Sequence, residues 1–166
     1  MFLIQTYSIV DADWYNDCTT NSLETYFTFP SSVSRSYSND GVTLSNSGSY
    51  ASMPFYQSFS TPKVVEFELI DHNQSAPNMV LGQIGSTWIY CEYNYRKTQF
   101  DFSGTTVQCS STLGKWRFEI DTNQIKVYRE NTLLYTYNGS LSTLAFQIQL
   151  SGNRSATIKD LLIKPL

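Results

Sequence analysis

The stretch K-W-R-F-E-I at residues 115–120 decides the fold, because apolar and charged side chains alternate along it. In an extended strand successive side chains point to opposite faces, so Trp116, Phe118 and Ile120 share one face and the charged residues share the other. This pattern predicts a strand with one buried face and one face in water, which is usual in antiparallel sheets.

Two further alternating segments follow, at residues 124–129 and 133–137. The turn sequences D-T-N at 121–123 and E-N-T at 130–132 join the three segments into a predicted meander. Other strands are predicted at residues 26–29, 42–44, 63–70, 79–84, 87–95, 99–102, 105–108, 145–150 and 156–163. So many short strands predict an all-β fold, a two-sheet antiparallel β-sandwich or jelly roll, formed by residues 1–166 as a single domain.

The composition excludes several classes of protein. Charged residues make up only 15% of the chain, and the formal net charge is −3. The acidic pI near 5.0 gives no attraction for a phosphate backbone, so nucleic acid is not expected as a partner. An aromatic content of 15% is too high for a disordered chain, and no apolar run approaches the roughly 18 residues of a membrane-spanning helix.

The start of the chain and its three cysteines bear on processing and redox state. Residues 1–10 lack the positive charge of a signal peptide and are expected to form a first strand or an anchoring arm. Cys18, Cys91 and Cys109 match no zinc motif and are expected to be free thiols, although pairing between two of them stays open.

The second half of the chain resembles a known superfamily. The segments that carry the resemblance are K-W-R-F-E-I at 115–120, I-K-V-Y at 125–128, E-N-T-L-L-Y at 130–135 and A-T-I-K-D-L-L-I at 156–163. They resemble the Trp-opened strand, the hairpin and the closing strand of concanavalin-A-like lectin and glucanase domains. The resemblance implies a jelly roll whose ligand lies on the concave sheet or its rim. Small domains of this kind occur as carbohydrate-binding modules, in surface adhesins and on phage tails and baseplates.

The strand at residues 87–95 provides the main candidate site. Alternation places four of its side chains on the face opposite the core, where two flat aromatic rings accompany a carboxylate and an amide. Aromatic rings stack on sugar C–H faces, and amides and carboxylates bind sugar hydroxyls. The predicted ligand-binding residues are Gln83, Trp88, Tyr90, Glu92, Asn94, Gln147 and Gln149. The alternative is that Trp88 and Tyr90 cover a small cluster under a loop.

An acidic strand provides a second candidate. Glu66 and Glu68 point from the same face of a predicted strand, and Asp71 follows. The pattern weakly resembles the catalytic strand of retaining β-glucanases, but the central acid is Glu instead of Asp and the last acid is Asp instead of Glu. The alternative is an acidic strand face in water.

Two further polar features offer groups that can bind metals or take part in catalysis. His72 is the only histidine and is expected to be a polar turn residue. Asp11, Asp13 and Asp17, with Asn16, offer oxygen ligands of the kind that Ca²⁺ accepts, but they lack the Gly and final Glu of a helical calcium loop. A solvated acidic turn is the alternative, and no other cofactor is expected.

The leading hypothesis is a non-catalytic carbohydrate-binding or adhesion module at an extracellular or virion surface, such as a viral receptor-binding component. Repeated weak sites gain avidity on an oligomer, so a homo-oligomer is expected. One alternative is a structural or assembly domain that docks through residues 1–10. The other is a glycoside hydrolase that uses Glu66, Glu68 and Asp71.

Overall fold

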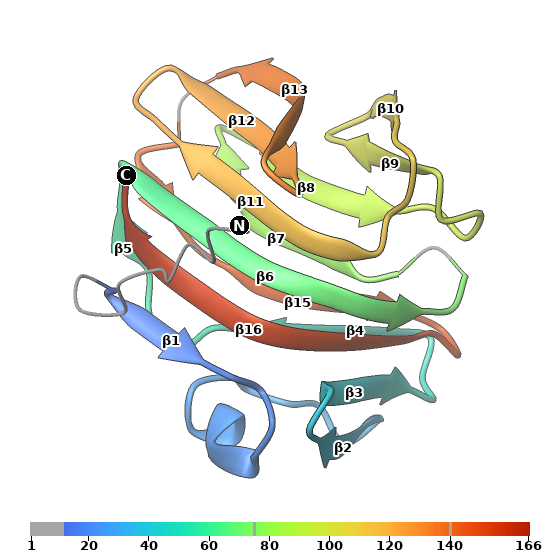
Figure 1. The fold of residues 1–166 in the computed structure, drawn as a ribbon. Coiled ribbons are helices and arrows are strands. Elements are labelled where there is room, and N and C mark those ends of the chain that lie inside the picture. The colour runs from blue at the N-terminus through green and yellow to red at the C-terminus, as the bar shows by residue number, and fades with distance from the viewer. Residues whose placement is uncertain (1–11, 75, 140) are drawn as a thin grey trace, which may run out of the picture.

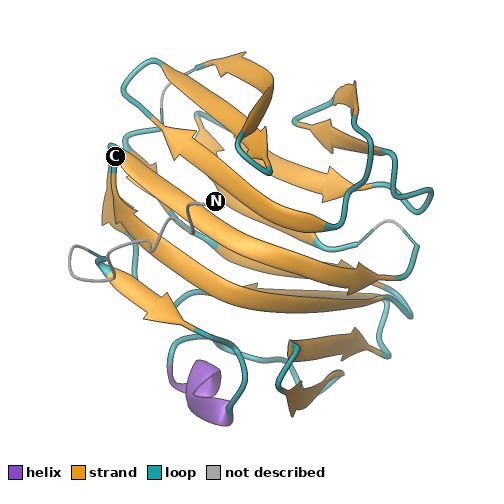
Figure 2. Ribbon diagram, in the orientation of Figure 1, coloured by secondary structure: helices purple, strands orange, loops and turns teal. Residues whose placement is uncertain are grey.

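The computed structural model describes residues 12–74, 76–139 and 141–166. Two antiparallel sheets stack face to face, with β6, β11 and β16 crossing in front of β7, β8 and β15 (Figure 1). Strands make up nearly all of the regular structure (Figure 2). The predicted antiparallel jelly roll is confirmed. The arm or first strand predicted at residues 1–10 lies outside the described residues.

The eight-stranded sheet contains the predicted meander. Its strands in spatial order are β13 (Thr132–Asn138), β12 (Gln124–Arg129), β11 (Gly114–Ile120), β6 (Lys63–His72), β16 (Ser155–Pro165), β3 (Gly41–Asn46) and β2 (Val33–Ser38), and β1 (Trp14–Asn16) pairs with β16. The turn from β12 to β13 is formed by Glu130 and Asn131, whose φ angles are 46° and 64°. Positive φ at both positions is what a tight two-residue hairpin needs to match the strand twist.

The six-stranded sheet forms the second layer. Its strands in spatial order are β10 (Thr105–Gln108), β9 (Gln99–Phe102), β8 (Thr87–Tyr93), β7 (Asn78–Ile84), β15 (Gln147–Ser151) and β4 (Tyr50–Pro54). The remaining elements are a small sheet of β5 (Phe59–Ser60) and β14 (Thr143–Leu144), and the 3₁₀ helix η2 (Asn21–Thr25). Across the described ranges, no helix is long and apolar enough to cross a membrane.

Aromatic rings from both sheets meet in the core between them. The Trp116 ring lies 4.7 Å from the Tyr93 ring and 5.1 Å from the Phe100 ring, both in edge contact. The Trp116 indole N–H also donates to the backbone oxygen of Thr112 at 2.8 Å. These contacts bury β11 against β8 and β9, so the stretch that predicted the fold is also the contact that joins its two layers.

The strand predicted at residues 26–29 is wrong. Only Phe27 makes an isolated bridge, to Phe55, and the preceding residues form a 3₁₀ helix. The Phe27 ring packs against the rings of Phe55, at 5.2 Å, and Trp14, at 6.2 Å. Ring packing at the edge of the sandwich therefore replaces strand pairing in this segment.

The three cysteines are free, as the sequence predicts. Cys18 and Cys91 are buried, and Cys109 is half-buried. Burial raises the pKa of the Cys18 thiol to about 12, so this thiol is protonated at neutral pH.

His72 is not a turn residue, contrary to the prediction. It ends β6 and is 3% exposed, because the pairing of β6 with β16 shifts between Leu69 and Asp71. A one-residue shift reverses the faces of a strand, which turns His72 inward. Its Nε2 lies 2.8 Å from the Thr112 hydroxyl, and burial lowers the pKa of the imidazole.

Replacing Trp116 with Ala should lower the free energy of unfolding by about 3–5 kcal/mol, because a large core side chain is lost. The matched control, Trp88→Ala, removes an exposed ring and should change stability by about 0.5 kcal/mol or less. Denaturant unfolding of both variants measures the difference, and equal losses would contradict the assignment of core and surface.

Acidification should destabilise the fold through His72. The pKa of His72 is lowered in the folded state, so below the ordinary histidine pKa the unfolded chain binds a proton that the folded chain does not. The free energy of unfolding should therefore fall as the pH decreases below about 6.5, the ordinary histidine pKa, and His72→Gln should remove most of this decrease. The same decrease in the variant would show that another group is responsible.

Candidate functional site

The core determines which side chains of β8 reach the surface. Ile89, Cys91 and Tyr93 are fully buried between the sheets. Alternation along the strand then turns Trp88 and Tyr90 to the outer face of the six-stranded sheet. The two rings therefore do not belong to the core cluster.

Two other strands of this sheet, β15 and β4, follow the same rule. On β15, Ile148 and Leu150 are buried, so Gln147 and Gln149 face outward. On the edge strand β4, Tyr50 lies on this outer face and is 54% exposed. Side chains from β8, β15 and β4 thus share one surface of the six-stranded sheet.

A groove of about 380 Å³ lies on this surface. It is lined by Tyr50, Ser52, Asn78, Val80, Trp88, Tyr90, Gln147 and Gln149. Val80 is only 2% exposed yet lies outside the main core cluster, so it forms an apolar floor for the groove. All eight lining residues are uncharged. The groove therefore offers aromatic, amide and hydroxyl groups, with no ionic partner for a ligand.

Hydrogen bonds hold the amides of the groove in place. The Ser52 hydroxyl donates to Gln147 Oε1 at 2.7 Å, and Gln149 Nε2 donates to the same oxygen at 3.3 Å. These bonds use the carbonyl side of Gln147 and orient its amino group. Preorganised polar groups bind a ligand at a lower entropic cost than mobile ones.

The two most exposed rings lie on opposite sides of the groove. Trp88 on β8 is 45% exposed, and Tyr50 lies on β4, with β7 and β15 between them. Neighbouring strands are about 4.8 Å apart, which separates β8 from β4 by about 14 Å. A ligand that contacts both rings is therefore longer than a single sugar ring.

Four of the predicted ligand-binding residues line the groove, and the others lie outside its lining. Those that line the groove are Trp88, Tyr90, Gln147 and Gln149. Gln83 pairs with Trp88 across β7 and β8 and is exposed at the groove's end. Asn94 lies beyond the end of β8, where its Oδ1 accepts a hydrogen bond from the Arg96 backbone N–H at 2.9 Å. The structure therefore does not bring Asn94 into the groove.

Glu92 shares the outer face but lies just outside the groove. It pairs in register with Asn78, a groove residue, and with Asp101 on the other side. Burial raises the pKa of the Glu92 carboxyl, and the charge of Asp101 raises it further, whereas Arg154 at 3.6 Å lowers it. The ion pair of Glu92 and Arg154 thus borders the groove, with Asp101 on the β9 side.

Four residues that line the groove are not among the predicted ligand-binding residues. Tyr50 and Ser52 lie on β4, a strand that was not predicted because its sequence Y-A-S-M-P is short and ends in Pro. Asn78 directly precedes the strand predicted at residues 79–84, and Val80 lies within that strand. The alternation of Tyr50 and Ser52 with buried Ala51 was the available signal.

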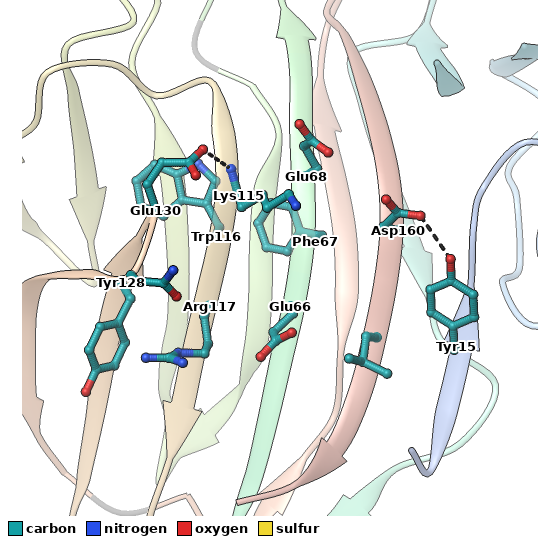
Figure 3. Close-up of a pocket in the computed structure, with 12 residues that line it drawn as sticks. Tyr15, Glu66, Phe67, Glu68, Lys115, Trp116, Arg117, Tyr128, Glu130 and Asp160 are labelled. Atoms are coloured by element: carbon teal, nitrogen blue, oxygen red, sulfur yellow. Dashed lines mark hydrogen bonds between the residues drawn. The ribbon is translucent and has the colours of Figure 1, made fainter. Parts of the chain in front are cut away.

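The acidic strand lies on the other layer of the sandwich. Glu66 and Glu68 face outward from β6 in the eight-stranded sheet and line a second groove of about 220 Å³ (Figure 3). Lys164 forms an ion pair with Glu66 at 3.0 Å, and Lys115 lies opposite Glu68 in register. Asp71 is not among the lining residues and pairs with Lys97, which lowers the pKa of its carboxyl.

Side chains that line this second groove also contact one another. The Arg117 guanidinium lies 4.2 Å from the centre of the Tyr128 ring. On the opposite side, the Tyr15 hydroxyl donates to Asp160 at 2.9 Å (Figure 3). Burial and this hydrogen bond raise the pKa of Tyr15 to about 12. The acids of β6 therefore lie on a sheet face where opposite charges are interleaved.

The residues considered for Ca²⁺ do not gather into a ligand set. Asp11 lies outside the described residues, and Asp13 forms an ion pair with Lys63 at 2.7 Å. Asp17 and Asn16 accept hydrogen bonds from backbone N–H groups of their own turn. In the part of the chain that the structure describes, no three acidic, histidine or cysteine side chains are grouped to hold a metal ion.

No protein-family model and no curated protein sequence matches this chain. Its fold, however, is similar to solved structures. A Bacillus subtilis protein of unknown function with a galectin-like fold aligns with a TM-score of 0.71 and 10% identity, over 93% of this chain and 96% of that one.

Two further similar structures carry carbohydrate-related names. The Bacillus licheniformis β-glucanase aligns with a TM-score of 0.70 and 14% identity, over 92% of this chain and 98% of that one. The carbohydrate-binding module CBM66 from Bacillus subtilis aligns with a TM-score of 0.63 and 11% identity, over 83% of this chain and 94% of that one. At such low identity, these similarities establish a concanavalin-A-like and galectin-like β-sandwich fold.

Proposed function

We propose that the protein is a non-catalytic carbohydrate-binding module whose glycan lies in the groove on the outer face of the six-stranded sheet. The observation that carries the proposal is the lining of this groove, which combines exposed rings at Trp88 and Tyr50 with amides and a hydroxyl and contains no charge.

This lining matches the chemistry of a neutral sugar. A pyranose ring presents an apolar C–H face, which stacks on an aromatic ring, and hydroxyl groups around its edge, which need hydrogen-bond partners. Gln147, Gln149, Asn78 and Ser52 supply such partners from adjacent strands. Charged groups are not needed to bind a neutral glycan, and a ligand with several charges would find no counter-charge among the lining residues.

The similar folds support the proposal at a coarse level. Their names include a carbohydrate-binding module and a β-glucanase. Because one fold can host unrelated functions, the argument rests on the groove and not on the fold. Display at an extracellular or virion surface, in several copies, would suit a weakly binding module of this kind.

Trp88→Ala should weaken glycan binding about tenfold, which is about 1.4 kcal/mol, through loss of a stacking ring. The measurement is calorimetric titration against laminarin, lichenan, xylan, mannan, galactan and levan. Tyr95→Ala is the matched control, because Tyr95 is 56% exposed but lies outside the groove.

The control should bind as tightly as the unmodified chain. If no polysaccharide of the panel binds, or if the Trp88 and Tyr95 variants bind equally well, the assignment of the site is wrong.

A second candidate function is glycoside hydrolysis by Glu66 and Glu68. The observation in its favour is that both carboxylates line one groove, in which a sugar could contact them together. The ion pair of Glu66 with Lys164 and the remote position of Asp71 argue against it.

The non-catalytic proposal predicts that the full chain releases no reducing ends from the same polysaccharide panel. Hydrolysis that is lost in Glu66→Gln and retained in Glu119→Gln would establish the second candidate instead. Glu119 is a suitable control because it faces outward from β11 and does not line the groove.

A further inference from the structure

A further hollow, of about 490 Å³, adjoins the groove that contains Trp88 and lies at the β4 edge of the six-stranded sheet. It is lined by Pro54, Phe55, Tyr56, Gln57, Ser58, Ala145, Phe146 and Gln147. We call it the edge hollow. It shares Gln147 with the groove, and Gln147 pairs directly with Pro54 in the register of β15 and β4. The two spaces therefore meet at one side chain.

The edge hollow repeats the chemistry of the groove. It contains an exposed ring at Tyr56, amides at Gln57 and Gln147 and a hydroxyl at Ser58, and none of its lining residues is charged. The groups that suit a neutral sugar in the groove are thus present a second time, on the same edge of the sheet.

Tyr56 is held in place although it is 58% exposed. Its ring packs against the rings of Phe55, at 4.9 Å, and Tyr26, at 5.6 Å, and its backbone N–H donates to the Tyr26 oxygen at 2.8 Å. Phe55 is in turn fixed by edge contact with Trp14 at 4.8 Å. An aromatic surface supported in this way loses little side-chain freedom when a ligand stacks on it.

The positions of Tyr50 and Tyr56 set the length of a ligand. They are six residues apart on one segment of chain, with Ser52 and Pro54 between them on the outer face. At about 3.4 Å per residue an extended chain covers about 20 Å over this distance. A monosaccharide cannot reach from one ring to the other, whereas a chain of several sugars can.

Gln147 is suited to bridge the two spaces. Its Oε1 accepts the hydrogen bonds from Ser52 and Gln149, and among the described residues no hydrogen bond engages its Nε2. The two amide hydrogens therefore stay available to a ligand at the junction.

We propose that the edge hollow is a second sugar subsite and that the protein binds an extended neutral glycan chain across Gln147, from the groove to Tyr56. This proposal rests on the proposed function, and it adds the ligand's length, its direction along β4 and a second stacking residue.

The test is calorimetric titration of the full chain with oligosaccharides, from disaccharide to hexasaccharide, cut from the panel polysaccharide that the unmodified chain binds. Affinity should rise about tenfold or more between the shortest and longest members, because the longer chains reach Tyr56. Tyr56→Ala should remove this rise and leave the disaccharide affinity unchanged, whereas Trp88→Ala should weaken binding at every length.

Two controls keep the test decisive. Tyr56→Phe retains the ring and its packing, so it should preserve the rise in affinity, and unfolding midpoints check that each variant folds. A flat dependence on length in the unmodified chain, or a rise that persists in Tyr56→Ala, would overturn the edge subsite. If Trp88→Ala still weakens binding in that case, the proposed function stands and only the subsite is lost.

Discussion

The contact between Trp116 and Tyr93 is the constraint on which the rest of the molecule depends. It joins the two sheets through rings 4.7 Å apart and fixes which face of β8 is buried. Because strand side chains alternate, burying Tyr93 with Cys91 and Ile89 leaves Trp88 on the outer surface. A slip of one residue would exchange the core for the groove, so the burial that stabilises the sandwich also builds the candidate site.

The groove that contains Trp88 lies on the strands of the six-stranded sheet, whereas the edge hollow lies where β4 ends. Gln147 belongs to both spaces, and β4 leaves the sheet at Pro54 to place Tyr56 against Tyr26 and Phe55. The aromatic cluster at this edge explains why residues near Phe27 form ring contacts instead of a regular strand. A rigid ring cluster under an exposed tyrosine is a suitable support for a stacking ligand.

Sequence reasoning predicted the features that depend on alternation. The meander, the two-sheet fold and the outward positions of Trp88, Tyr90 and Gln147 all follow from period-two patterns next to a strong core. The sequence did not predict features that depend on strand pairing in the folded chain. The shift in the pairing of β6 that buries His72 has no signal in the sequence, and β4 is too short to recognise. Nor could the sequence tell that the acidic strand and the aromatic strand lie on opposite layers.

The central claim is that a glycan contacts the outer face of the six-stranded sheet, and the three tryptophans allow a direct measurement. Trp14 and Trp116 are buried, and Trp88 is 45% exposed in the groove. In an NMR titration with the polysaccharide-derived hexasaccharide, the indole N–H signal of Trp88 should move while those of Trp14 and Trp116 stay in place. Movement confined to backbone signals of Lys115, Arg117 and Tyr128 would place the ligand in the other groove and contradict the account.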